Sequence, residues 1–283
     1  MFGMGATLSV QDFWNVVRTP QAVLLCLVVQ VVIAPLLALV LARMLRLPAG
    51  TSMGLLLIAA LPGGLFSNVF TYLGRGNVAL SVSSTAVASL GSLVTTAFVL
   101  RTFGNTQLPE GFVMPVARIL TEIGIWLLLP LCLGMVVHRA APRPAPAVSK
   151  VFIWISMAIL AIFIVSALFS GRIKVTDYGW RTPAALLLFS IISFWICYAL
   201  GFLIRLKVVD SFTVGIECVV RNVQLGILLA ASLFPANPLK DDSIGSGAIF
   251  ALLFYGGSCL AIAGFEIVVR HKNLGIHAER RLP

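Results

Sequence analysis

The chain has 283 residues, of which 59% are hydrophobic and 11% charged, and its mean hydropathy is +1.03. This composition excludes an ordinary water-soluble domain, because the apolar runs are long enough to cross a hydrocarbon core of about 30 Å repeatedly. The formal net charge of +10 does not indicate nucleic-acid binding, since Lys and Arg stand singly or in pairs in short connections. We therefore predict an all-α polytopic membrane protein that contacts the lipid bilayer and binds no nucleic acid.

The chain opens with MFGMGATLS, which lacks the basic start and the full apolar run of a signal peptide. It resembles the end of a membrane helix, so residues 1–19 are interpreted as the remnant of a preceding helix followed by a cytoplasmic turn. Apolar runs bounded by Pro, Gly or basic residues then predict eight crossings. These fall near residues 20–45, 51–74, 77–101, 116–138, 149–170, 182–206, 209–234 and 244–269.

Two of these crossings are interrupted in comparable places, the first by Pro62-Gly63-Gly64 and the second by the polar stretch 217–224. A linker at residues 138–150 divides the eight predicted crossings into a first four and a second four. Paired interruptions of this kind indicate an inverted-repeat transporter whose site lies near the bilayer midplane. A break frees N–H groups at one half-helix start and C=O groups at another half-helix end, so an anion and a cation can bind side by side.

Glu217 is the central candidate, because an ionisable residue within a membrane segment is costly and is read by default as part of a substrate, ion or proton pathway. Ser81 and Thr85 are four residues apart on one helix face, and Ser67-Asn68 follow the first break. Hydroxyl and amide oxygens are ligands that hard cations prefer, and one carboxylate would complete a monovalent cation site. The alternative is that these hydroxyls bond to their own helix, while Ser67-Asn68 cap a broken one.

Three separated motifs agree in order and spacing with one known family. They are LVVQVVIAPLLALVLA at 27–42, PGGLFSNVFTYLGRGNVALSVSSTAV at 62–87 and GIECVVRNVQLGILLA at 215–230. With these motifs the chain resembles the bile acid:sodium symporter family. The resemblance implies a core domain with two crossed, discontinuous helices that moves against a panel domain and carries organic anions with sodium.

The resemblance also implies a set of site residues. It maps one sodium site onto Ser67, Asn68, Ser81, Thr85 and Glu217. It maps a second cation site onto Gln30, Glu217, the backbone carbonyls near Cys218 and Val220, and position 221. It places Asn68 and Asn222 against the substrate, with Leu65 at the mouth of the pocket.

Arg221 departs from the family pattern, which usually has glutamine at this position. Arginine is a donor only and stays charged, so it cannot ligate sodium. Two unit charges about 4 Å apart interact by about 4 kcal/mol at an effective dielectric near 20, or roughly a thousandfold in affinity. One hypothesis is that Arg221 replaces the second sodium permanently and pairs with Glu217. The alternative is that its side chain extends to the membrane interface.

The resemblance further implies a division of the chain. Residues 20–103 would be core helices of the first repeat, 112–172 panel helices of the second repeat, 182–271 core helices of the second repeat, and 272–283 a basic tail. The panel helices of the first repeat would be missing ahead of Met1. Either the start was placed too far downstream, or the chain is a shortened member that dimerises or is inactive.

The sequence has no HExxH, no GxSxG and no paired aspartates in its apolar segments, which excludes the common intramembrane enzymes. A channel would need a ring of repeated ligands. We predict a symporter of small organic anions in the bacterial inner (plasma) membrane, coupled to sodium at Glu217 and without a cofactor or another metal. The alternatives are a sodium-independent or proton-coupled carrier, or an inactive member.

Overall fold

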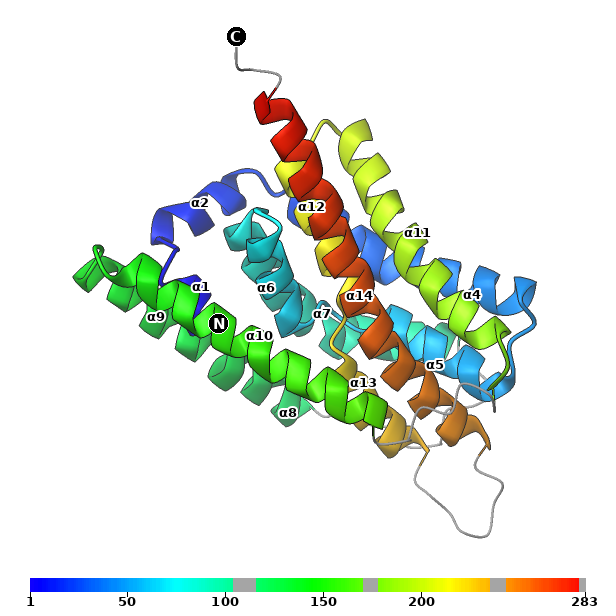
Figure 1. Cartoon of the computed structure of the whole chain (residues 1–283). Helices are drawn as coiled ribbons and strands as arrows, with labels where there is room; N and C mark the ends of the chain where they lie inside the picture. Colours follow the sequence, from blue (N-terminus) through cyan, green and yellow to red (C-terminus); the bar gives the residue numbers. More distant parts are fainter. Residues whose placement is uncertain (104–115, 170–177, 235–242, 280–283) are drawn as a thin grey trace.

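The computed structural model describes residues 1–103, 116–169, 178–234 and 243–279 (Figure 1). Their regular structure is helical, apart from one isolated bridge between two extended segments. The first half contains α1 (Phe2–Gly5), α2 (Val10–Arg18), α3 (Gln21–Val28), the π-helix η1 (Val29–Ile33), α4 (Ala34–Met44), α5 (Ala49–Ala60), α6 (Leu65–Leu73) and α7 (Val78–Phe103). The second contains α8 (Val116–Thr121), the π-helix η2 (Glu122–Leu128), α9 (Leu129–Ala140), α10 (Ala145–Phe169), α11 (Arg181–Leu203), α12 (Val208–Val219), α13 (Val223–Leu233) and α14 (Ser243–Glu279).

Five stretches of the described residues are long and apolar enough to cross a membrane by length and composition. They are Gln21–Met44, Val78–Phe103, Ile123–Ala140, Arg181–Leu203 and Ile244–Lys272. The prediction of an all-α polytopic membrane protein is confirmed. Each of the eight predicted crossings coincides with a helix, with helices joined end to end, or with an interrupted pair.

Helices extend further at both ends of the chain than the predicted crossings do. Residues 10–18, in the segment where a helix remnant and a turn were expected, form helix α2. Its first turn is fixed by Asp12, whose carboxylate accepts hydrogen bonds from the N–H and the hydroxyl of Ser9 at 2.8 and 2.7 Å. At the other end, α14 continues beyond residue 272 to Glu279.

Both π-helices precede a proline by two residues. Val29–Ile33 lies before Pro35, and Glu122–Leu128 lies before Pro130. A proline has no N–H to donate to the preceding turn, so the carbonyls there shift their bonding and the helix widens locally. The wider turn of η1 carries Gln30, a predicted site residue.

The same local geometry precedes both interrupted helices. Arg46 and Arg205 have positive φ values of 51° and 59°, and each ends a helix in the left-handed conformation. The N–H of Leu206 closes the second turn on the carbonyl of Gly201 at 2.8 Å, as expected for this type of helix end. The helices that follow, α5 and α12, have 12 residues each. The two halves of the chain therefore build their interrupted helices in the same way.

The two interrupted helices run in opposite directions and cross. Figure 1 shows α6 and α12 in the upper part of the molecule and α5 and α13 in the lower part. The antiparallel arrangement brings Asn77, just after α6, against Asp210 at the start of α12, with 2.8 Å between Asn77 Nδ2 and Asp210 Oδ1. We call residues 61–64 the first break and residues 220–222 the second break. The second break is shorter than predicted, because residues 217–219 still belong to α12.

Small residues allow the helices around the crossing to approach closely. A Cβ added to Gly54 of α5 would meet the Cβ of Ala251 at 2.6 Å and the backbone of Ala248 at 2.9 Å, both on α14. Contacts of this kind drive association of helices in a membrane, where lipid is as apolar as a leucine side chain. Helices α5, α11, α12, α13 and α14 thus supply much of the main buried cluster.

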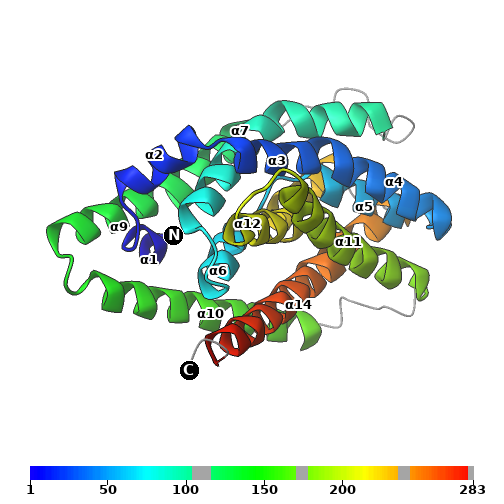
Figure 2. The ribbon, with the colours of Figure 1, turned by 90° about the horizontal axis from the view of Figure 1, so that it is seen from above.

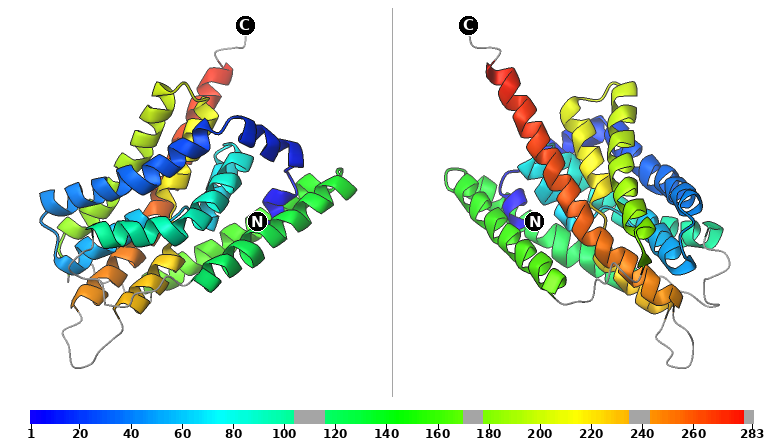
Figure 3. Two further views of the ribbon diagram at one scale, coloured as in Figure 1. Left: turned by 180° about the vertical axis from the view of Figure 1, so that it is seen from behind. Right: turned by 45° about the vertical axis from the view of Figure 1, so that its right-hand side comes forward.

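The short helix α1 packs between α9 and α10, on a different side of the molecule (Figure 2). A Cβ at Gly5 or at Gly134 would overlap backbone atoms of the facing helix, so the two helices touch through their main chains. The view from behind in Figure 3 shows this group of helices beside α6 and α7.

Candidate functional site

The two breaks are joined to each other by main-chain hydrogen bonds. The N–H of Gly64 donates to the carbonyl of Val220 at 2.8 Å, and the N–H of Asn222 donates to the carbonyl of Pro62 at 2.9 Å. These bonds form the isolated antiparallel bridge of the fold. They replace helical bonds that the breaks remove, and they hold four half-helix ends at one point.

Glu217 lies next to this crossing and is completely buried, with 0% of its surface exposed. Its Oε2 accepts hydrogen bonds from Ser67 Oγ at 2.6 Å and Ser81 Oγ at 3.0 Å, and its Oε1 accepts one from Thr85 Oγ1 at 2.6 Å. Ser67 comes from α6, Ser81 and Thr85 from one face of α7, and the carboxylate from α12. The structure therefore brings together four of the five residues predicted for the sodium site around one carboxylate. The hydroxyls bond across helices.

Asn68, the fifth residue of that prediction, lies in the same cluster. Its Nδ2 donates to Thr85 Oγ1 at 3.2 Å, whereas its Oδ1 is buried and has no hydrogen-bond partner. An unpartnered buried oxygen is costly, and it is an acceptor that a cation can satisfy. The cluster thus combines a buried carboxylate of α12 with oxygens from two other helices, α6 and α7.

The two glycines of the first break are required by close approach. A Cβ added to Gly63 would overlap the carboxylate of Glu217, and one added to Gly64 would lie 2.7 Å from the carbonyl oxygen of Arg221. From the sequence, this pair is predicted only to break a helix. Its second role, to admit the carboxylate and the opposite main chain, depends on contacts between distant parts of the chain.

The groups predicted for a second cation site have hydrogen-bond partners within the protein. Gln30 is buried, and its Nε2 lies 3.2 Å from the sulfur of Cys26, which in turn is 4.0 Å from the sulfur of Cys218. The carbonyl of Val220 accepts the N–H of Gly64 across the crossing. Arg221 has other partners.

The guanidinium of Arg221 bonds to the ends of both interrupted helices. Its Nε donates to the carbonyl of Cys218 at 2.7 Å and its Nη1 to the carbonyl of Leu61 at 2.7 Å. The side chain is 3% exposed, so it does not extend to the interface. Among the described residues the bonds of Arg221 run to these carbonyls, and the bonds of Glu217 run to the three hydroxyls. Within the described residues, Arg221 and Glu217 therefore do not form the ion pair that one hypothesis predicted.

Side chains also saturate the neighbouring carbonyls at the two breaks. Thr96 Oγ1 donates to the carbonyl of Ala60 at 2.7 Å, and the hydroxyl of Tyr255 donates to the carbonyl of Val219 at 2.6 Å. Both donors lie outside the three motifs, on α7 and α14. Sequence analysis missed them, because a buried Thr or Tyr in an apolar helix carries no signal of its partner.

The residues predicted to face the substrate lie at the starts of the second half-helices. Asn222 precedes α13 and caps it, with its Oδ1 accepting from the N–H of Leu225 at 3.1 Å. Leu65 is the first residue of α6 and is partly exposed. Helix starts carry partial positive charge, so both places are favourable for an anionic group.

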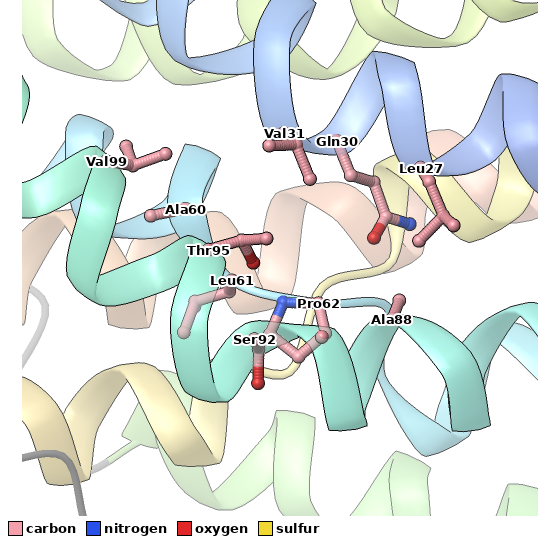
Figure 4. Close-up of a pocket in the computed structure, with 11 residues that line it drawn as sticks. Leu27, Gln30, Val31, Ala60, Leu61, Pro62, Ala88, Ser92, Thr95 and Val99 are labelled. Carbon is pink, nitrogen blue, oxygen red and sulfur yellow. The ribbon is translucent and has the colours of Figure 1, made fainter.

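One cavity lies beside the first break, and another lies at the opposite end of α6. The first, of about 20 Å³, is bounded by η1, the end of α5 and α7, with Gln30, Pro62 and Ser92 among its lining residues (Figure 4). The second is larger and open, with about 700 Å³, and lies where α1 and α2 face the turn between α6 and α7. The larger cavity can hold a small organic molecule, and its lining includes the cations Arg75 and Lys150 together with the acidic Asp12.

Crossed, interrupted helices around a buried charge are the architecture of secondary transporters. Comparison with known proteins agrees with this class. The family model described as "Sodium Bile acid symporter family" matches residues 1–177. The chain belongs to this family, as its motifs predicted. The family is described as one of symporters, and the relatives named below are transporters and cotransporters, which accords with the expectation that the chain is no enzyme.

Individual relatives are similar over most of the chain. The "Uncharacterized sodium-dependent transporter YocS" of Bacillus subtilis (strain 168) is 35% identical over 92% of this chain and 79% of its own length. The "Probable sodium/metabolite cotransporter BASS2, chloroplastic" of Oryza sativa subsp. japonica is 30% identical over 93% of this chain. The "Sodium-dependent organic anion transporter" of Bos taurus is 25% identical over 96% of it. The chain spans 61% of the length of the rice protein.

Proposed function

We propose that the chain is a carrier of small organic anions that is coupled to sodium at Glu217. The observation that carries this proposal is the cluster of oxygens around the fully buried carboxylate, including Asn68 Oδ1, which has no partner. Hard cations take several oxygen ligands, and one negative charge matches one monovalent ion. The names of the similar proteins support sodium as the coupling ion.

The hydroxyls of the cluster can change partners when an ion enters. Ser67 Oγ lies 2.6 Å from Glu217 Oε2 and also 2.6 Å from the carbonyl of Gly64. Its proton can turn to that carbonyl and leave an oxygen lone pair for sodium. Ser81 Oγ has a similar second neighbour in Thr71 Oγ1 at 3.3 Å. Sodium would then connect α6, α7 and α12, and it would favour the conformation in which these helices are held together.

The substrate class follows from charge and from the cavities. The starts of α6 and α13 attract an anionic group at the crossing, and the open cavity adds Arg75 and Lys150. The bovine relative is named for organic anions. We propose that residues 20–103 and 182–271 form the moving core, that residues 112–172 form panel helices, and that the substrate passes between them. Residues 112–115, 170–172 and 235–242 of these ranges lie outside the described residues.

Sodium-dependent stability of the purified chain tests the ion site. A ligand that binds only the folded state stabilises it by about 2.7 kcal/mol when its free concentration is about 100 times its Kd. We expect sodium, compared with choline, to raise the thermal unfolding temperature of the wild type but not of Glu217→Gln. Glu266→Gln is the matched control, because it makes the same change on α14, away from the cluster. An equal sodium response of Glu217→Gln and the wild type would remove the proposed ion site.

A thermal-shift screen tests the substrate class. Monocarboxylates, dicarboxylates, sulfate esters and matched neutral amides are compared with and without sodium. We expect stabilisation by anions that grows with sodium, since a symporter binds its two loads cooperatively. Stabilisation by the neutral amides alone would contradict an anion carrier.

A further inference from the structure

Two helix ends converge on the guanidinium of Arg221. It donates to the carbonyl of Cys218 in the last turn of α12 and to the carbonyl of Leu61 at the end of α5. The C-terminal end of a helix carries about half a negative elementary charge. Two such ends at one point attract a full positive charge, and this chain supplies it from its own sequence.

The charge of this guanidinium is permanent. Arginine is not deprotonated in proteins, and the side chain is 97% buried with its Nη2 unpartnered. A free cation at the same place would meet a like charge that water screens poorly, which weakens its binding on the order of a thousandfold at about 4 Å. It would also meet carbonyls that already accept hydrogen bonds, from Arg221 itself, from Tyr255 and from Gly64.

The cluster around Glu217 has the opposite character. Its unpartnered group is an acceptor, Asn68 Oδ1, whereas the unpartnered group of Arg221 is a donor. Neither charge neutralises the other through a direct bond. The crossing thus contains one cluster of oxygen acceptors around a carboxylate and one place where a cation is built in.

We propose that Arg221 is a resident cation which closes the second ion position at the crossing, so that the protein binds one sodium ion per chain. This inference rests on the proposed sodium site at Glu217 and adds its stoichiometry. The residue also fixes the two breaks to each other, because its two bonds join the end of α5 to the end of α12.

Direct counting of bound ions tests the proposal. The purified full chain in lipid nanodiscs is titrated with sodium-22, and the number of ions per chain and the Hill slope are measured. We expect one ion and a slope of one for the wild type. Arg221→Gln removes the charge and adds an amide oxygen, so we expect a second ion and a slope above one. Arg221→Lys keeps the charge, and we expect it to remain at one ion.

The outcomes separate this inference from the proposed function. Two ions in the wild type would overturn the resident cation while leaving sodium coupling intact, and so would a folded Arg221→Gln that still binds one. No ion in the wild type would overturn both. If Arg221→Gln fails to fold, the counts for the wild type and Arg221→Lys decide, since one ion in each supports the proposal and two in either refutes it. We expect Glu217→Gln to bind no sodium, which would identify the counted ion as the one at the carboxylate.

Discussion

Substitution of Gly63 by alanine tests the geometry of the proposed ion site most directly. The added Cβ would overlap Glu217 Oε1 and would lie 2.7 Å from Glu217 Cδ, against about 3.5 Å for an ordinary contact. The carboxylate must therefore move away from the first break. Its hydrogen bond with Thr85 Oγ1, now 2.6 Å long, involves the same oxygen and is the first that we expect to be lost.

The size of the effect follows from that bond. A hydrogen bond to a charged group contributes about 1.5–3 kcal/mol, which corresponds to about 10- to 150-fold in affinity. We expect Gly63→Ala to weaken sodium binding by this factor, measured by sodium-22 titration of the purified chain. Gly257→Ala is the matched control, because a Cβ there meets nothing within 4 Å. Wild-type affinity in a folded Gly63→Ala protein would refute the placement of the carboxylate against the first break.

Three further substitutions test separate contacts. Thr85→Val keeps the shape of the side chain but removes a donor to Glu217, so we expect sodium affinity to fall about 10- to 100-fold with the fold retained; an unchanged titration would exclude Thr85 from the site. Tyr255→Phe leaves the carbonyl of Val219 without its donor, and we expect a loss of about 1–3 kcal/mol in stability, seen as a lower unfolding temperature; a wild-type temperature would count against this bond. Arg46→Gly relieves a left-handed conformation and should raise the unfolding temperature by an amount equivalent to about 1 kcal/mol, whereas a decrease would contradict the strain at this turn.

The fold was predictable from sequence because lipid leaves few options. A backbone in hydrocarbon must satisfy its own hydrogen bonds, so apolar length and composition identify the helices, and Pro62-Gly63-Gly64 identifies the first break. The predicted second break was too long, because it began at the polar residue Glu217. In the structure Glu217 lies within α12, and only residues 220–222 separate α12 from α13. Here the charged residue marks a buried polar cluster and does not mark the break itself.

The candidate site was partly predictable for a similar reason. Ser81 and Thr85 share a helix face, so their common direction follows from their spacing. The partners of Arg221 did not follow from spacing. Glu217 is four residues away on the same chain and suggested a local ion pair, but the end of α5 supplies a carbonyl from 160 residues away. The donors from Thr96 and Tyr255 belong to the same category, because tertiary packing alone brings them to the crossing.

The built-in guanidinium has a consequence for the energy that drives accumulation. Glu217 and Arg221 together carry no net charge, and a sodium ion with a monovalent anion adds none. Moving one elementary charge through 100 mV is worth about 2.3 kcal/mol, and a neutral load gains or loses none of it. Under the proposed stoichiometry, membrane voltage does not contribute to the uptake of a monovalent anion, and a tenfold sodium gradient supports tenfold accumulation. Uptake would continue in a depolarised cell for as long as sodium remained unequal across the membrane.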